Sequence, residues 1–157
     1  MNDLQDEVTA VETLLRNSLF QQVTSGALLT GTAFGPTWGS TGTAPVLGNG
    51  THTGTYWRIG KLVFFIEALI IGSTSTFGTG VYTLSLPAVA ANSGAVAFGV
   101  AVDASAALTY GINCVLSSSS ALVPYPTNTS SAGITSAVPF TWATSDALYI
   151  AGFLQET

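Results

Sequence analysis

The segment 61–71 limits the fold of this chain more than any other part of the sequence. It is strongly apolar, carries Glu67 near its middle, and is roughly half as long as a membrane-spanning helix. Its even-numbered positions are all apolar, which predicts a β-strand whose even side faces a hydrophobic core. The odd positions mix Lys61 and Glu67 with large apolar side chains, which indicates that a neighbouring subunit covers that second face. The predicted oligomer contacts on this strand are Val63, Phe65, Leu69 and Ile71.

Period-two patterning between turn residues predicts further strands on both sides of this segment. The predicted strands run over 53–59, 61–71, 79–86, 94–103, 107–116, 137–143 and 146–154. Short strands with no helix between them predict a mainly β fold, an antiparallel β-sandwich or jelly roll. A chain of 157 residues suffices for one such domain.

Residues 2–22 are the one segment with a convincing helical pattern. Asn2 is a suitable N-cap, and Gln5 stands where a capping box places its second residue. Apolar residues then follow at steps of four, three and four, which is the spacing of a coiled-coil seam. The predicted helical oligomer contacts are Leu4, Val8, Val11 and Leu15. Packing of this helix on its own domain fits the same pattern, and a helix this short needs one partner or the other.

Gly, Thr, Ser and Pro punctuate residues 25–52 and predict an irregular connection there. The expected organisation is therefore a helix for oligomerisation or attachment over 1–24, a linker with loops over 25–52, and the β-domain over 53–157. Residues 117–120 and 125–132 are predicted to form long surface loops.

Charged residues make up 7% of the chain, against roughly 25% in typical soluble proteins, and hydrophobic residues reach 47%. A surface so poor in charge favours contact with further copies of the chain, and the expected partner is therefore a homo-oligomer. The alternative is a monomer that Ser, Thr and Asn alone keep in solution. The net charge of −5, with only three basic residues, argues against nucleic acid as a partner.

The N-terminal residues are acidic and lack the basic segment that precedes the apolar part of a signal peptide. No apolar run reaches the length of a spanning helix. We therefore expect synthesis in the cytoplasm and no insertion into a membrane. The single cysteine, Cys114, lies in a β-like apolar run and is predicted to be a buried thiol without a disulfide partner.

Catalysis needs a titrating group or an activated nucleophile, and the sequence offers few of either. His52, the only histidine, lies in a Gly- and Thr-rich segment and is predicted to be a polar turn residue. A carboxylate pair would have to come from Glu67, Asp103 and Asp146, and turn hydrogen bonding already accounts for Asp146. Neither metal-ligand spacing nor a phosphate-binding Gly-rich loop occurs. The sequence therefore predicts a non-enzymatic protein with no catalytic residues, no metal site and no cofactor.

Aromatic side chains leave room for a binding function. The candidate contacts for a ligand or receptor are Trp38, Trp57 and Tyr125, which would stack on sugar rings if two or three were exposed together. A role in the core or in a subunit interface is the simpler interpretation of each.

Three segments carry a resemblance to a known family. Residues 45–65 read PVLGNGTHTGTYWRIGKLVFF, residues 80–87 read GVYTLSLP, and residues 139–153 read PFTWATSDALYIAGF. These motifs resemble a module of the minor structural proteins of tailed phages. The chain departs from that module at Ser145, where Gly usually precedes the Asp, and at Phe153, where Tyr is expected.

The resemblance covers roughly residues 36–157 and implies a β-sandwich or jelly-roll domain, usually trimeric, on the surface of a virion. The expected partners are then other virion proteins of the capsid or tail, with a host surface glycan as a further ligand. A single short helix before the β-domain favours a capsid decoration or head fibre. The alternative is the receptor-binding tip of a tail fibre, and a glycan-degrading enzyme is the least favoured class.

Overall fold

The computed structural model describes residues 7, 9–11, 30–127 and 132–157. The chain forms two compact units, 1–31 and 32–157. In the first unit, residues 7 and 9–11 have helical backbone and Val11 is exposed. Most of the predicted helix and its other three contacts lie outside the described residues. Within the described part of the chain, no helix is long and apolar enough to cross a membrane.

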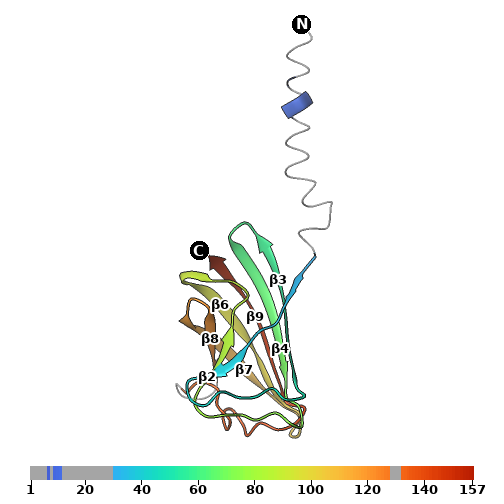
Figure 1. Ribbon diagram of the computed structural model, residues 1–157, viewed down its shortest axis with the longest axis vertical. Coiled ribbons are helices and arrows are strands. Elements are labelled where there is room, and N and C mark those ends of the chain that lie inside the picture. Colours follow the sequence, from blue (N-terminus) through green and yellow to red (C-terminus); the bar gives the residue numbers. More distant parts are fainter. Residues whose placement is uncertain (1–6, 8, 12–29, 128–131) are drawn as a thin grey trace. The chain divides into compact units, whose positions relative to one another are not determined.

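The second unit is a single antiparallel sheet of nine strands (Figure 1). The strands are β1 (Thr32–Phe34), β2 (Trp38–Ser40), β3 (Thr51–Ile59), β4 (Leu62–Ile70), β5 (Tyr82–Ser85), β6 (Ala90–Asp103), β7 (Leu108–Ser118), β8 (Ala121–Pro126) and β9 (Ala147–Glu156). Their order across the sheet is β1-β3-β4-β9-β6-β7-β8-β5-β2. The prediction of a mainly β, antiparallel fold is confirmed.

The sheet is curled into a half-barrel (Figure 1). Its two edge strands, β1 and β2, stand at opposite ends of the strand order, yet residues 35–37 alone connect them. A connection this short spans at most roughly 14 Å, so the two ends of the sheet must lie close to each other. Curling therefore gives the sheet an inner face that encloses a core and an outer face that does not.

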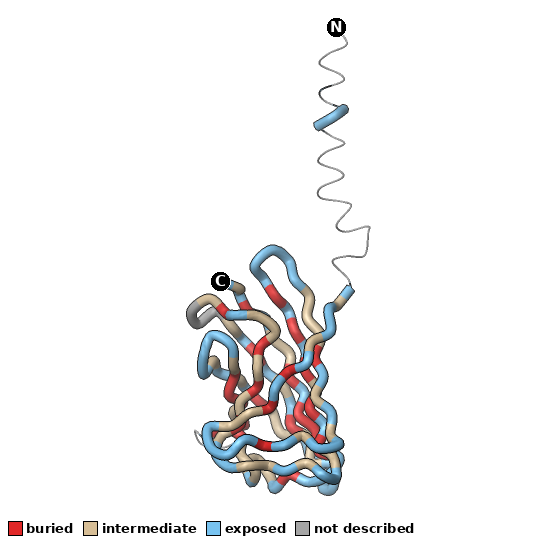
Figure 2. The backbone as a smooth tube through the Cα atoms, viewed as in Figure 1, coloured by how far each residue is buried: buried red, intermediate tan, exposed pale blue. Residues whose placement is uncertain are grey.

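The inner face carries the hydrophobic core, and buried positions alternate with exposed ones along the strands (Figure 2). The largest fully buried apolar side chains are Tyr82, Phe65, Leu69, Ile71, Leu84, Ile112, Leu122, Ile134, Leu148 and Leu154. They come from β4, β5, β7, β8 and β9 and from the segments that follow β4 and β8. One core thus joins both halves of the sheet.

A run of aromatic rings ties the long connection between β8 and β9 to this core. The Trp38 and Tyr82 rings lie 5.1 Å apart edge to face, and Tyr82 lies 6.5 Å from Trp142. Trp142 in turn lies 4.7 Å from Phe140. Because Trp142 is buried and its Nε1 donates to the Val138 carbonyl, the connection packs as part of the unit.

The faces of β4 are the reverse of those predicted. Its odd side is the core side: Val63, Phe65, Leu69 and the following Ile71 are 0–2% exposed inside their own subunit. These four residues are therefore not available to a neighbouring subunit, and their prediction as oligomer contacts is wrong. The physical reason is Glu67, whose charge indicated an outward side but which is itself buried among them.

Three short strands were missed and one was predicted in excess. β1 and β2 lie in the predicted linker, so the β-unit begins at Thr32. β8 contains two prolines, and its last two residues belong to the predicted loop 125–132. Prolines inside a strand and three-residue strands both escape a search for period-two patterns. Residues 137–143, predicted as a strand, are irregular, and a single isolated bridge joins Val138 of this segment to Thr135.

Ser145 adopts a left-handed backbone conformation, with a φ of 75°. This conformation costs an L-residue roughly 1–2 kcal/mol, whereas glycine adopts it freely. We expect Ser145→Gly to raise the free energy of unfolding by about 0.5–1 kcal/mol, measured by urea denaturation. Thr144→Gly, at a neighbouring exposed position without a left-handed backbone, is the control and should lower stability. Equal effects of the two substitutions would contradict the explanation.

Candidate functional site

The outer side of the central strands carries large apolar side chains that no part of the described chain covers. We call this set the outer apolar face. Its members are Leu62, Phe64, Ile66 and Ile70 of β4, Tyr149 and Phe153 of β9, and Val96, Phe98 and Val100 of β6. Each is 36–57% exposed. Residues paired across antiparallel strands share a face, and the pairing of β4 with β9 and of β9 with β6 brings these side chains together.

The outer apolar face is uncharged. Its neighbours on β3, by the register of the β3–β4 pair, are Thr51, Thr53, Thr55, Trp57 and Ile59. Its neighbours on β7, by the register of the β6–β7 pair and the alternation of the strand, are Thr109, Gly111, Asn113 and Val115. No Asp, Glu, Lys or Arg occurs among these described positions or within the face itself. Its chemistry is therefore that of a contact surface.

The size of the face distinguishes it from scattered surface apolar residues. A large side chain offers roughly 150–250 Å² when free, so these nine at their exposed fractions present roughly 700 Å². The largest apolar patch on an ordinary monomer is about 300–600 Å². Patches above that range mark sites of association.

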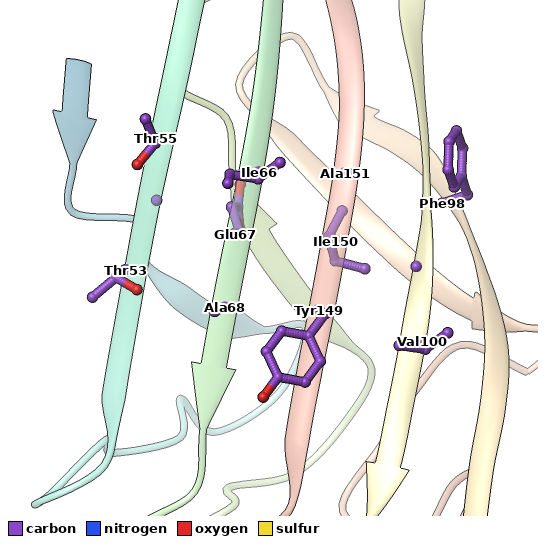
Figure 3. Close-up of a pocket in the computed structure, with 12 residues that line it drawn as sticks. Thr53, Thr55, Ile66, Glu67, Ala68, Phe98, Val100, Tyr149, Ile150 and Ala151 are labelled. Carbon is purple, nitrogen blue, oxygen red and sulfur yellow. The ribbon is translucent and has the colours of Figure 1, made fainter. Parts of the chain in front are cut away.

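A groove of about 500 Å³ crosses the face, open to solvent (Figure 3). Ala151 lies between Ile66 on β4 and Phe98 on β6, because it pairs with both. Ala68 lies beside Tyr149 in the next row of the sheet. Small side chains on the floor and large ones along the sides thus create the hollow.

The three aromatic residues predicted as ligand contacts do not come together. Trp38 is buried in the core and is not accessible to a ligand, so that prediction is wrong. Trp57 pairs with Phe64 and Tyr125 pairs with Asn113, so both lie on the outer side, partly exposed. Four strands separate β3 from β8 in the sheet order. These residues therefore form no common binding site.

The sequence predicted that His52 is a polar turn residue, and that prediction is wrong. It lies in β3, and its Nε2 is 3.4 Å from Oε2 of Glu67, with the two side chains 2% and 1% exposed. Among the described residues, neither side chain has a well-aligned hydrogen bond. Burial raises the pKa of Glu67, and the neighbouring His52 offsets this only in part. The pair is enclosed in the core, where a dissolved substrate has no access to it.

This burial makes stability depend on pH. Because the pKa of Glu67 is raised in the folded protein, the folded state holds a proton that the unfolded chain releases above pH 4.5. The stability from this group is thus present at low pH and is lost as pH rises through the folded-state value. We expect Glu67→Gln to match the wild type near pH 4 and to be the more stable protein at pH 8, as measured by urea denaturation. Parallel pH profiles of the two proteins would contradict the assignment.

The two aspartates of the β-unit accept hydrogen bonds in turns, and Glu156 pairs with Arg58. Asp146 is 1% exposed and accepts hydrogen bonds from the backbone N–H groups of Ala104 and Ala143, at 2.9 and 2.6 Å. Asp103 accepts from the Ala106 N–H and from Ser105 Oγ, and these bonds lower its pKa. The turn role that the sequence suggested for Asp146 is therefore confirmed.

Cys114 is a free, partly buried thiol on the inner side of β7. Burial, together with the nearby Glu67, raises its pKa to about 12. Such a thiol stays protonated at neutral pH and is a poor nucleophile. Among the described residues, no three His, Cys, Asp or Glu side chains gather as metal ligands would.

Comparison of the chain with known protein families, with curated proteins and with solved structures found no match. The outer apolar face is therefore the feature on which a functional assignment depends. Its residues Ile66, Phe98 and Tyr149 were absent from the predicted contacts. For Ile66 the signal was present in the sequence, because the even side of segment 61–71 is entirely apolar, but the prediction placed that side in the core.

Proposed function

We propose that this protein is a non-enzymatic structural protein of a phage particle, which self-associates, as a trimer, on the surface of the virion. The role that we favour is a capsid decoration or head fibre. The observation that carries the proposal is the outer apolar face, roughly 700 Å² of uncharged surface in a chain with 7% charged residues. A folded unit with such a surface is suited to a permanent complex rather than to a monomeric state in solution.

The distribution of ionisable groups supports a structural role. Of the groups considered for catalysis, His52 and Glu67 are enclosed in the core, and Asp146 holds backbone N–H groups. Paired carboxylates in a glycosidase must reach a sugar from an open cleft. The groove on the outer face is instead lined by apolar and small residues, apart from its threonines, the Tyr149 hydroxyl and the inward-pointing Glu67.

The finer fold belongs to the same proposal. We assign the curled sheet to the β-sandwich or jelly-roll class, since β1 and β2 follow each other in the chain while they pair at opposite ends of the strand order. Strands that pass from one layer to the other in this way close a sandwich around one core. A trimer of such units is what the resemblance of residues 36–157 to phage structural proteins implies.

The location on a virion rests on that resemblance. The left-handed Ser145 supports it, because this is the position where the phage module usually has Gly. Left-handed backbone favours Gly, so the structure gives a physical reason for that feature of the motif.

Image reconstruction of particles of the virus that encodes this chain tests the role. We expect density for the β-unit on the capsid surface, in groups of three, and the protein in mass spectra of purified particles. Density at the tail alone would replace the decoration role by the alternative. Absence of the protein from purified particles would contradict both.

The alternative is the receptor-binding tip of a tail fibre that recognises a host glycan or surface protein. Trp57 and Tyr125 are each partly exposed, at separate places on the outer side, and each offers one ring for a sugar to stack on. Deleting the gene distinguishes the roles. Loss of host adsorption supports the tip, whereas unchanged adsorption with less stable particles supports the decoration.

A further inference from the structure

We propose that the outer apolar face is the surface on which a second copy of this chain packs, with an aromatic ridge of one copy seated in the groove of the next. The inference rests on the proposed self-association and identifies the residues that carry it. The inference assigns the contact on β4 to the side chains on the outer side of the strand. The contacts predicted from the sequence lie on the other side and fill the core: Val63, Phe65, Leu69 and Ile71.

The area of the face fits this occupant. A stable interface of ordinary size buries about 800 Å² on each partner. The outer apolar face presents roughly 700 Å², and Val115 on β7, itself 56% exposed, extends it beyond β6. One copy therefore contributes close to what one partner of a stable complex must bury.

The shape of the face provides its own complement. Phe64 and Phe153 lie side by side, with their ring centroids 6.3 Å apart, and Val96 continues this row on β6. We call these three residues the ridge. In the next row, the small Ala151 separates Ile66 from Phe98 and forms the floor of the groove (Figure 3). Ridge and groove are adjacent rows of one surface, so two copies can each offer what the other accepts.

The chemistry of the face points to the same partner. Because the face is uncharged, an acidic or basic partner would leave its own charges buried without counter-ions. A second copy offers a surface that is equally apolar. Of the charged side chains at the β3–β4 end of the sheet, Arg58 and Glu156 are bonded to each other at 3.1 Å, and Lys61 lies exposed in the turn itself. A ridge that enters the groove of the next copy makes a head-to-tail contact, which generates a ring when the rotation from copy to copy closes.

The test is a substitution that places a large side chain of the chain itself in the groove. In Ala151→Phe the new ring points outward between Ile66 and Phe98, where it occupies the place of the neighbour's ridge. We expect the complex to dissociate at least about 100-fold more readily in sedimentation equilibrium. The free face of the variant should also bind a hydrophobic dye that the assembled wild type does not bind. Ala44→Phe, an exposed alanine outside these strands, is the matched control and should assemble as the wild type does.

The outcomes separate this inference from the proposed function. A wild-type protein that remains a monomer would contradict self-association itself. A wild-type oligomer whose affinity Ala151→Phe leaves unchanged would contradict this interface alone. Ile66→Ser, which removes one side of the groove without adding bulk, should weaken assembly about 10-fold and covers the case in which Ala151→Phe fails to fold. A wild-type monomer that binds detergent micelles would identify a lipid or another protein as the occupant and overturn the inference.

Discussion

Phe98→Glu is expected to convert the assembled protein into a folded monomer. Phe98 is 57% exposed in the subunit, the highest value on the outer apolar face, so the substitution leaves the core intact. In the assembly, however, the new carboxylate would be removed from water without a partner, which costs several kcal/mol. We expect the dissociation constant to rise more than about 100-fold, which corresponds to roughly 2.7 kcal/mol. Size-exclusion chromatography with light scattering measures the change.

Val46→Glu is the matched control for this prediction. Val46 is 58% exposed and lies between β2 and β3, away from the central strands, where its backbone bridges to Thr76. The same charge at this site should leave the oligomer unchanged. If Phe98→Glu and Val46→Glu behave alike, the outer apolar face is not the interface. Circular dichroism of both variants should show the wild-type β spectrum.

Asp146→Ala is expected to produce the largest loss of stability of any single substitution considered. The Asp146 carboxylate binds the N–H groups of Ala104 and Ala143, and so joins the β6–β7 turn to the start of β9. The backbone at this point is also bonded to the end of β4, through the Ile71 N–H and the Asp146 carbonyl. Alanine would leave two partly buried donors without acceptors and a cavity beside them. We expect unfolding to become easier by about 3–5 kcal/mol.

A domain of this size is stable by only about 5–15 kcal/mol, so the melting temperature of Asp146→Ala should fall by more than about 10 °C. Asp146→Asn keeps one oxygen acceptor and should lose less. Asp103→Ala is the matched control, because Asp103 binds the N–H and hydroxyl groups of its own exposed turn alone, and it should cause a small fraction of the loss. Similar losses for Asp146→Ala and Asp103→Ala would contradict the role of Asp146 as a link between segments.

The mainly β fold could be predicted from the sequence because long strands carry a strong period-two pattern. β3, β4, β6, β7 and β9 all fall within a few residues of the predicted strands. β1 and β2 could not be predicted, since three residues are too few for a pattern and only their pairing with distant strands stabilises them. The curl of the sheet follows from these two strands, and it was therefore outside the reach of local patterns as well.

The orientation of β4 shows why the candidate site was misplaced. Both faces of this strand are apolar, so its pattern does not decide which one is inner, and the charges of Lys61 and Glu67 on the odd side decided the prediction. The Glu67 side chain is buried because His52, opposite Leu69 on β3, lies next to it. A contact between residues on two strands belongs to the tertiary structure, and the pattern of neither segment alone predicts it.

β6 contained a better indicator of the outer face. Its large residues Val96, Phe98 and Val100 alternate with Ala97, Gly99 and Ala101, and the small residues are the inner ones. Inside a curled sheet the side chains of several strands crowd together, so small residues are required there. The alternation of large and small residues in β6, combined with its pairing to β9, thus indicates which side of the sheet faces outward. The charges in β4 had led to the opposite assignment.

The mass of the wild-type protein in solution tests the central claim of self-association most directly. Light scattering of the purified chain at micromolar concentration should give a multiple of the 16.0 kDa subunit mass, and the proposed trimer requires three times that value. The mass should fall towards one subunit on dilution or in Phe98→Glu. A constant 16.0 kDa at every concentration would contradict the claim.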